Sequence, residues 1–337
     1  MAVRMHQVKC LLLLSAIAIC VSASHFLDAE WNVWTSKYGR QYKDLEEEQF
    51  RRTAWEANWE RVQKHNQLAD QGLSKYWMAV NHFADMTNEE LRSKSCLIYS
   101  GEFSKPSNIP QKSLNAKNPN IPEEVDWRKS NCITPVKNQG NCGSCWAFAA
   151  IGVVESRLCL KNGNLVQLSE QQLVDCDTSD SGCCGGMPLL ALQYVTEKGV
   201  MKSQDYEYTQ KKFTCLYKPD EAITLNVTKY YGVPGEDNIA SSVASEGPII
   251  VGFGVDTEFF FYVKGVYDGS CAPYPNHAII IVGYGTEYDK NNEDNNEDYW
   301  LIKNSWGEQW ADEGYGKIKR NVNKCSIADM AATIDLQ

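Results

Sequence analysis

The distribution of thirteen cysteines constrains the fold of this 337-residue chain more than any other feature. Three precede residue 100, at Cys10, Cys20 and Cys96, and the other ten lie between Cys132 and Cys325. Cysteines at this density are typical of domains that fold in an oxidising compartment, where disulfides persist. If one of the ten is a reactive thiol, nine remain, which predicts four disulfides and one odd cysteine.

The first two dozen residues have the pattern of a targeting segment. Arg4 and Lys9 precede an apolar run from Cys10 to Val21, and the small residues Ser22–Ser24 follow. A charged start, a short apolar centre and a small-residue exit are typical of a secretory signal peptide. The alternative is a membrane anchor, but the run is shorter than the ~20 residues that span a bilayer. We therefore predict a signal peptide over residues 1–23, no membrane span after it, and passage through the secretory pathway.

Overall composition excludes one class of partner. The chain is 43% hydrophobic and 23% charged, as in ordinary globular proteins, and its formal net charge is −10. Proteins that bind nucleic acid present basic patches, and no run of Lys or Arg occurs here. We therefore expect no nucleic-acid partner.

The N-terminal third after the signal peptide is predicted to be helical. Trp55, Trp59 and Val62 recur at i, i+4 and i+7 within Asp44–Ala69, which indicates one long amphipathic helix. Residues 101–122 are polar and contain several prolines, a composition typical of an exposed linker that proteases cut.

The remainder of the chain mixes helix and strand patterns. An apolar helical run covers Trp146–Leu160, and alternating segments at residues 249–251, 259–263, 278–282 and 299–302 predict strands. Residues 287–298 are rich in Asp, Glu and Asn, and we interpret them as a solvated loop because they lack the glycine-anchored spacing of a calcium site. Helices followed by strands predict an α+β fold of two subdomains.

The strongest local signal is a cysteine at the start of the apolar helix. Gly140, Gly143 and Ser144 precede Cys145, and the helical pattern begins there. A helix N-terminus favours the thiolate form of a cysteine, which is the form that attacks a carbonyl carbon. The alternative is that Cys145 is one more half-cystine.

Two further residues complete a catalytic set. His277 is the only histidine after residue 120, so imidazole chemistry in that part of the chain must use it. Asn304 ends another predicted strand, within Asn304-Ser305-Trp306, and its amide oxygen could hold the imidazole in one orientation. The adjacent Trp306 could shield that hydrogen bond from water.

Together these segments resemble the papain family of cysteine proteases, in its cathepsin L-like branch. The motifs are Cys142-Gly143-Ser144-Cys145-Trp146, then His277, then Asn304-Ser305-Trp306. The 132 positions between Cys145 and His277 fit the spacing of that family. The resemblance implies a Cys145–His277 thiolate–imidazolium pair, Asn304 as its orienting residue, and Gln139 as a donor to the oxyanion. It implies no cofactor and no metal.

The N-terminal third resembles the propeptides of the same branch. Residues at the spacing of the first propeptide motif are Glu47, Arg51, Trp55, Asn58, Val62 and Asn66, where Trp55 and Val62 depart from the usual Phe and Ile. Asn81, Phe83 and Asp85 resemble the second motif, with Ala79 in place of its glycine. The implied organisation is a signal peptide (1–23), an inhibitory propeptide with linker (24–120) and a mature papain-like peptidase domain (121–337). The implied fold is a helical left subdomain and a β-barrel-like right subdomain, preceded by a helical prodomain.

The family pattern also implies substrate contacts. The pocket for the substrate residue two before the scissile bond would have walls at Met187, Pro188, Gly252 and Ala278 and a base at Met330, and Gly185, Gly186 and Trp306 complete the set. None of these residues is a carboxylate, which predicts Leu, Phe or Val at that position rather than Arg. The segment Cys215–Gly235 is too short for the occluding loop of cathepsin B, which predicts a cleft open at both ends and endopeptidase activity.

The cysteines divide into those the family shares and those it does not. The implied shared disulfides are Cys142–Cys183, Cys176–Cys215 and Cys271–Cys325. Cys132 and Cys159 are extra, and by analogy with cathepsin B we predict a fourth disulfide between them. Cys184 would then be the odd thiol, unless it replaces Cys183 as the partner of Cys142.

Partners and location follow from the same resemblance. Expected partners are protein and peptide substrates, the chain's own propeptide and cystatin-type inhibitors. We expect the enzyme to be a monomer and to act in the lysosome or the extracellular space. Asn226-Val227-Thr228 is an N-glycosylation sequon, so Asn226 is a predicted glycan site. Carboxylates of the propeptide, including Glu47, Asp85 and Glu90, are expected at its contact with the enzyme, which would make activation depend on acid.

Two other classes of function compete with this one. A silent homologue or a propeptide-type inhibitor would lack the nucleophile or end before the catalytic segments, yet this chain has Cys145, His277 and Asn304. A redox or metal-binding module would need a second Cys or His cluster near Cys142 and Cys145, and the sequence has none.

Overall fold

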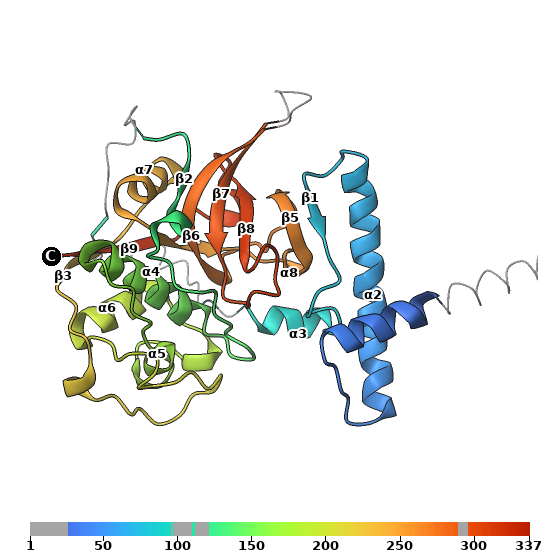
Figure 1. Ribbon diagram of the computed structural model, residues 1–337, viewed down its shortest axis with the longest axis horizontal. Helices are drawn as coiled ribbons and strands as arrows, with labels where there is room; N and C mark the ends of the chain where they lie inside the picture. Colours follow the sequence, from blue (N-terminus) through green and yellow to red (C-terminus); the bar gives the residue numbers. More distant parts are fainter. Residues whose placement is uncertain (1–25, 96, 98–109, 112–120, 289–295) are drawn as a thin grey trace, which may run out of the picture. The chain divides into compact units, whose positions relative to one another are not determined.

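The computed structural model describes residues 26–95, 97, 110–111, 121–288 and 296–337 (Figure 1). The predicted signal peptide, Cys96 and nearly all of the predicted linker lie outside the described residues. The chain divides into two compact units. One contains the residues up to Arg61 with Ala84–Met86, and the other contains Val62–Phe83 with Thr87–Gln337.

An aromatic cluster holds the first unit together. It lies between helical residues 26–37 and the first part of α2 (Leu45–Asp70). The ring of Trp31 lies 5.4 Å from that of Trp34 and 5.5 Å from that of Trp55, centroid to centroid. Asn58, one turn after Trp55, donates from Nδ2 to the carbonyl oxygens of Ala84 and Met86. These contacts explain why the two propeptide motifs occur together: residues of the first bind the backbone of the second.

A mixed sheet forms the centre of the second unit. Its strands follow the order β1-β5-β8-β7-β6-β4-β9-β3, with β2 also paired to β6. The pairs are antiparallel except β5 with β8. In chain order the strands are β1 (Tyr76–Met78), β2 (Val125–Asp126), β3 (Val227–Gly232), β4 (Ile249–Phe253), β5 (Tyr262–Tyr267), β6 (His277–Glu287), β7 (Glu297–Lys303), β8 (Tyr315–Lys319) and β9 (Ala331–Leu336).

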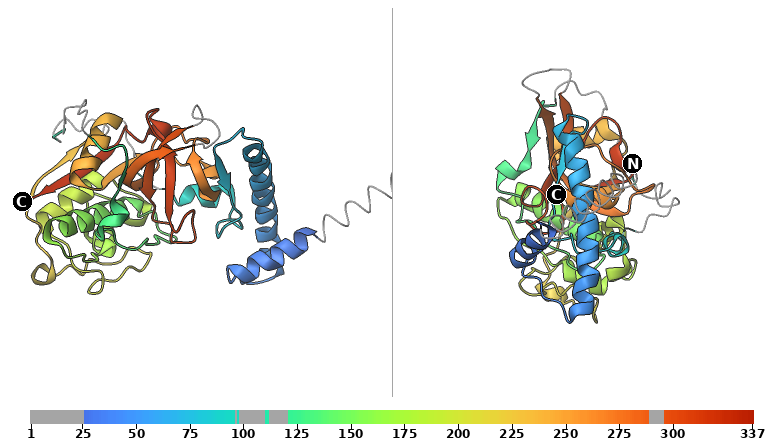
Figure 2. Two further views of the ribbon diagram at one scale, coloured as in Figure 1. Left: turned by 45° about the horizontal axis from the view of Figure 1, so that its top comes forward. Right: turned by 90° about the vertical axis from the view of Figure 1, so that its right-hand side faces the viewer.

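Helices flank this sheet (Figures 1 and 2). The long helix α4 packs against β6 on one side and against α5 and α6 on another. The α-helices are α3 (Asn88–Ser93), α4 (Cys145–Asn162), α5 (Glu170–Cys176), α6 (Pro188–Lys198), α7 (Glu236–Glu246) and α8 (Thr257–Phe261). Short 3-10 turns are η1 (Trp127–Ser130), η2 (Gly182–Cys184), η3 (Pro219–Glu221) and η5 (Lys324–Ser326).

The close approach of α4 to the sheet depends on one glycine. A Cβ atom added to Gly152 would lie 2.5 Å from Cδ1 of Ile280 on β6. Real Cβ atoms do not approach other atoms so closely, so a side chain at position 152 would require the end of the Ile280 side chain to move. Most of α4 is buried as a result, and its first residue, Cys145, has no exposed surface.

Most of the predicted elements are confirmed, with one correction. The helices expected at 44–69 and 146–160 correspond to α2 and α4, and the strands expected near 250, 280 and 300 correspond to β4, β6 and β7. The strand expected at 259–263 is wrong for its first three residues, which end helix α8. Asp256 caps that helix by accepting from the N–H of Thr257, and its phenylalanines are buried on the sheet. A short run of buried aromatic residues therefore fits a helix as well as a strand, and its sequence pattern does not distinguish the two.

Four disulfides cross-link the second unit. They join Cys132 to Cys159, Cys142 to Cys183, Cys176 to Cys215, and Cys271 to Cys325. These are the four pairs expected from the sequence. Two described cysteines lie outside them, the buried Cys145 and the exposed Cys184.

Replacing both Cys132 and Cys159 with Ser should lower the free energy of unfolding by about 3 kcal/mol, because a loop spanning 27 positions would open in the unfolded chain. The shift in urea midpoint measures this effect. Cys184→Ser, which removes an exposed thiol outside the disulfides, should change stability by less than ~0.5 kcal/mol. An unchanged midpoint in the double variant would contradict the expectation.

Candidate active site

Cys145 is held at the first turn of α4. Ser144 occupies the N-cap position, but its side chain does not cap the helix. Its Oγ instead lies 2.6 Å from the hydroxyl of Tyr208, which donates to the carbonyl oxygen of Gln139 at 2.8 Å. Cys145 is the first residue of α4, and the dipole of a helix N-terminus favours the thiolate form of a cysteine.

His277 begins strand β6 and is fully buried. Its Nε2 lies 2.8 Å from Oδ1 of Asn304, and an amide oxygen only accepts, so Nε2 carries the hydrogen. Nδ1 is buried and makes no hydrogen bond within the described part of the chain. Burial lowers the pKa of His277 to about 4, and the bond to Asn304 opposes that shift. A neutral ring with its acceptor nitrogen available is the form that takes a proton from a thiol.

Aromatic rings exclude water from this hydrogen bond. The ring of Trp306 lies 4.7 Å from that of His277 and is 1% exposed. Phe260 stacks on the other face of the cluster, 4.4 Å from Trp306. The predicted shielding role of Trp306 is consistent with this arrangement.

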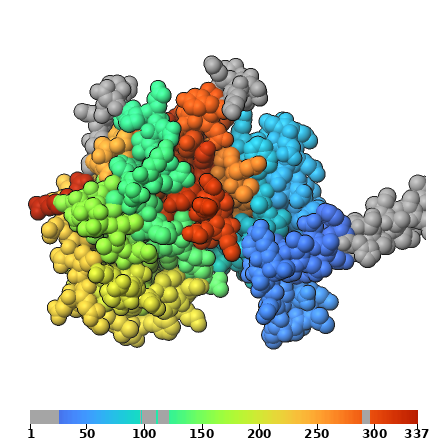
Figure 3. Space-filling model, in the orientation of Figure 1, coloured from blue at the N-terminus to red at the C-terminus, as the bar shows by residue number. Residues whose placement is uncertain are grey.

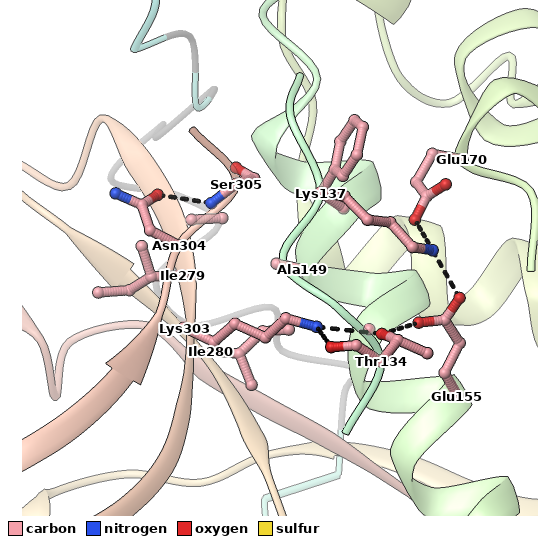
Figure 4. Close-up of a pocket in the computed structure, with 13 residues that line it drawn as sticks. Thr134, Lys137, Ala149, Glu155, Glu170, Ile279, Ile280, Lys303, Asn304 and Ser305 are labelled. Carbon is pink, nitrogen blue, oxygen red and sulfur yellow. Dashed lines mark hydrogen bonds and ion pairs between the residues drawn. The ribbon is translucent and has the colours of Figure 1, made fainter. Parts of the chain in front are cut away.

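Cys145 and His277 come from the same end of the α4–β6 contact. Ala149 and Gly152 of α4 line a small cavity of about 20 Å³ together with Ala278 and Ile280 of β6 (Figure 4). Cys145 lies one helical turn before Ala149, and His277 directly precedes Ala278. The two predicted catalytic residues thus precede the parts of α4 and β6 that line this cavity.

Gln139 lies beside this edge with its amide held in one orientation. Oε1 accepts from the Ser305 hydroxyl at 2.7 Å, so Nε2 must point the other way. Nε2 donates to the carbonyl oxygen of Cys142 at 3.0 Å and to that of Lys94 at 3.2 Å. A buried amide N–H directed at a carbonyl oxygen is the arrangement that an oxyanion donor requires.

The predicted pocket residues form two walls. On one, Gly252 pairs with Ala278 across β4 and β6, and its N–H donates to the carbonyl oxygen of Met330 at 2.7 Å. A Cβ on Gly252 would lie 2.8 Å from Cε of Met330 and 3.0 Å from Cβ of Pro275, a neighbour that the sequence did not indicate. The other wall is the buried segment Gly185–Pro188, which leads into α6.

Comparisons with known proteins agree with this geometry. Residues 121–334 match the profile of the papain family of cysteine proteases, and residues 31–91 match that of the cathepsin propeptide inhibitor domain. The chain belongs to the papain family.

The relatives cover almost the whole chain. Cathepsin S of Bos taurus is 40% identical over 330 residues, which is 95% of this chain and 96% of the relative. Procathepsin L of Rattus norvegicus is 40% identical over 90% of this chain and 91% of its own. The solved structure of digestive procathepsin L2 from the larval midgut of Tenebrio molitor aligns with a TM-score of 0.84 at 36% identity, over 92% of this chain and 100% of that one. The protein is therefore a cysteine endopeptidase with a propeptide inhibitor domain and a papain-like α+β fold.

A buried group of charged residues lies next to the segments that carry the predicted site residues (Figure 4). Nζ of Lys137 lies 2.6 Å from both Glu155 and Glu170, and Nζ of Lys303 donates to the carbonyl oxygen of Thr134. Burial raises the pKa of Glu170 to about 7, and attraction to Lys137 offsets part of that rise. Lys137 lies two residues before Gln139 and Lys303 directly precedes Asn304, so the group joins the two segments that carry site residues. In Figure 3 atoms coloured green and red, from distant parts of the sequence, lie side by side on the face shown.

Residues that follow the matched propeptide segment contact predicted site residues. The Lys94 carbonyl is the one that Gln139 Nε2 binds, and the Lys94 ammonium donates to the Gly140 carbonyl oxygen. The N–H of Leu97 donates to the carbonyl oxygen of Asn276, and its backbone pairs with Gly186 in a parallel bridge. Leu97 therefore touches both walls.

Several supporting residues were not indicated by the sequence. Ser305 was seen only as part of a motif, although its hydroxyl fixes the Gln139 amide. Tyr208 gave no signal, and Ser144 was seen only as part of a motif, because a hydroxyl that joins two loops has no sequence spacing of its own. The expected propeptide carboxylates were found, but with partners in the propeptide: Asp85 accepts from Tyr42.

The exclusion of a membrane span remains a sequence-based expectation for the N-terminal segment. Among the described residues, no helix has both the length and the apolar character needed to cross a bilayer.

Proposed function

We propose that this endopeptidase hydrolyses peptide bonds through Cys145 and His277. The observation that carries the proposal is the His277–Asn304 hydrogen bond, which commits Nε2 and leaves Nδ1 for the thiol. His277 takes the thiol proton, and the thiolate attacks the peptide carbonyl carbon. The imidazolium then protonates the leaving amine, a thioester forms, and water hydrolyses that thioester.

Gln139 stabilises the oxyanion in this proposal. Its Nε2 binds the propeptide's Lys94 carbonyl oxygen, a group of the same kind as the carbonyl oxygen under attack. Because Ser305 fixes the amide, little reorganisation is needed as negative charge develops on that oxygen.

The propeptide keeps the zymogen inactive in this scheme, and acid releases it. Lys94 and Leu97 occupy the positions that a substrate backbone would use, which supports direct blockage of the site. The propeptide strand β1 also joins the sheet beside β5, and the Tyr76 hydroxyl donates to Oε2 of Glu258 at 2.9 Å. Burial and the neighbouring Glu258 raise the pKa of Tyr76, so the tyrosine stays a donor. A hydrogen bond to a carboxylate is charge-assisted, so its loss would weaken the attachment of β1 to the sheet.

We further infer that the pocket formed by Met187, Pro188, Gly252, Ala278 and Met330 takes an apolar side chain. Gly252 adds no side chain of its own, the closest atom to its missing Cβ is the end of the flexible Met330 side chain, and no charged residue belongs to this set. The substrate residue two before the scissile bond would therefore be Leu, Phe or Val.

The remaining assignments are proposals that the family membership supports. They are a signal peptide over 1–23, a mature domain from 121, a glycan on the exposed Asn226, and a monomer that cystatin-type inhibitors bind. The secretory route would lead to the lysosome or the extracellular space.

Cys145→Ala and His277→Ala should each remove nearly all peptide hydrolysis, because the two side chains act as one proton-coupled unit. Gln139→Ala should lower kcat by roughly 10²-fold with little change in KM, as expected for an oxyanion donor. Asn304→Ala should leave measurable activity because it orients the ring. Steady-state kinetics on a fluorogenic peptide measures these effects. More than a few per cent of activity in His277→Ala would refute the assignment.

Loss of the Tyr76–Glu258 bond should weaken latency. We expect Tyr76→Phe and Glu258→Gln to process themselves at a higher pH than the wild-type precursor, because each removes one partner of the same hydrogen bond. The half-time of processing on gels across the acid range measures the shift. Tyr230→Phe, away from β1, serves as the control. Wild-type pH dependence in both variants would show that this contact does not control activation.

A peptide library varied at the residue two before the scissile bond should be cleaved best with Leu, Phe or Val. Arg should be poor, because burying its charge without a partner is costly. Gly252→Glu should raise the relative rate for Arg by supplying a carboxylate, with Gly252→Gln as the uncharged control. A wild-type profile dominated by Arg would disprove the apolar pocket.

A further inference from the structure

Two carboxyl groups are buried behind the wall at Gly185–Pro188, where the proposed mechanism has no use for them. Asp177 is 1% exposed and Asp180 is 7% exposed. In each residue Oδ2 is buried and has no donor among the described residues. The two carboxyl groups lie within hydrogen-bond reach of each other. Two acceptors can satisfy each other only if a proton lies between them.

The surroundings of the pair favour this proton. Burial raises the pKa of Asp180 to about 8 and also raises the pKa of Asp177. One cation opposes the shift: Lys212, whose side chain packs beside Gly182. Tyr194 of α6 is the other titratable group that faces Asp177, and it is uncharged when protonated.

Asp180 also closes the loop that forms the wall. Its Oδ1 accepts from the N–H of Met187 at 2.7 Å, and Oδ1 of Asp177 accepts from the N–H of Ser179 at 2.9 Å. Gly186 packs on the Trp146 ring and on Asp180: an added Cβ would lie 2.5 Å from Cδ2 of Trp146 and 2.8 Å from Cγ of Asp180. Asp180 therefore helps to position Gly186 through this packing and through its bond to the adjacent Met187.

The backbone of Gly186 forms the edge to which an extended segment binds in this structure. It forms one parallel β-bridge with the backbone of the propeptide's Leu97. Such pairing depends on the position and direction of backbone groups, so it is sensitive to small shifts of the edge.

We propose that Asp177 and Asp180 are positioning residues for peptide binding: their shared proton keeps the edge at Gly186 in the form that pairs with an extended chain. The proposal rests on the proposed function, because it assumes that substrates use the edge that Leu97 occupies. When the proton leaves, two negative charges face each other in a buried site and repel. Asp180 then shifts together with Met187 and Gly186.

The consequence is a defined pH dependence. Peptide binding is strongest while the pair holds its proton and weakens as pH rises through about 8. Stability changes in the same direction. A carboxyl whose pKa is raised in the folded protein stabilises the fold fully at a pH below its pKa in the unfolded chain, and that contribution is lost as the pH rises through its pKa in the folded protein.

Amide substitutions separate the proton from the shape of the loop. Asp180→Asn and Asp177→Asn keep an acceptor at Oδ1 and supply an N–H in place of the shared proton. We would process each protein from the full chain in acid and measure KM and kcat for one hydrophobic peptide from pH ~5.5 to ~9. Wild-type KM should rise about fivefold or more, the lower end of typical site-to-site coupling. KM should stay flat in both variants while the pH profile of kcat is unchanged. The exposed Asp220→Asn should behave as wild type.

Infrared spectroscopy of the full chain tests the proton without turnover. The wild-type spectrum at neutral pH should contain a protonated-carboxyl band that is absent from Asp180→Asn and disappears as pH rises through about 8. No such difference band, or a wild-type KM slope in both variants with normal cleavage, would overturn this proposal alone. Failure of the wild-type enzyme to cleave the peptide at any pH would overturn the proposed function.

Discussion

The contact between α4 and β6 is the constraint on which the rest of the site depends. Gly152 lets the helix lie against Ile280, and that separation sets how near the helix start comes to the strand start. A side chain at position 152 would first displace the end of the Ile280 side chain, and a bulky one would also change the spacing of the two elements. The predicted nucleophile and base would then shift relative to each other although neither had been altered. Catalytic geometry here is a consequence of core packing.

The end of β7 has a second organising role. Lys303, Asn304 and Ser305 are consecutive, and each bonds to a different part of the site. Lys303 binds the Thr134 carbonyl, Asn304 orients His277, and Ser305 fixes the Gln139 amide. One strand end therefore sets the orientation of the base and of the oxyanion donor at the same time, and a shift of that strand would disturb both.

The sequence predicted the parts of this protein that have a periodic or spaced signal. The helix at Cys145, the lone His277 and the Asn-Ser-Trp motif are such features, as are the long propeptide helix and the paired cysteines. Phe259–Phe261 were assigned to a strand because buried aromatics have no period that separates helix from strand over so short a run. Tyr208, Ser144 and Asp180 could not be predicted, since their roles depend on which loops meet in space.

In the proposed function, inhibition and catalysis use the same groups, which limits how the propeptide can act. Gln139 Nε2 binds the Lys94 carbonyl in the zymogen, and an oxyanion would need that same donor. Gly186 pairs with Leu97, and a substrate backbone would need that same edge. The propeptide thus gains its affinity from groups already arranged for substrate, while strand β1 adds contacts that no short peptide has. Loss of those outer contacts would weaken the hold of the N-terminal segment, although a segment joined to the same chain keeps a high effective concentration until the chain is cut.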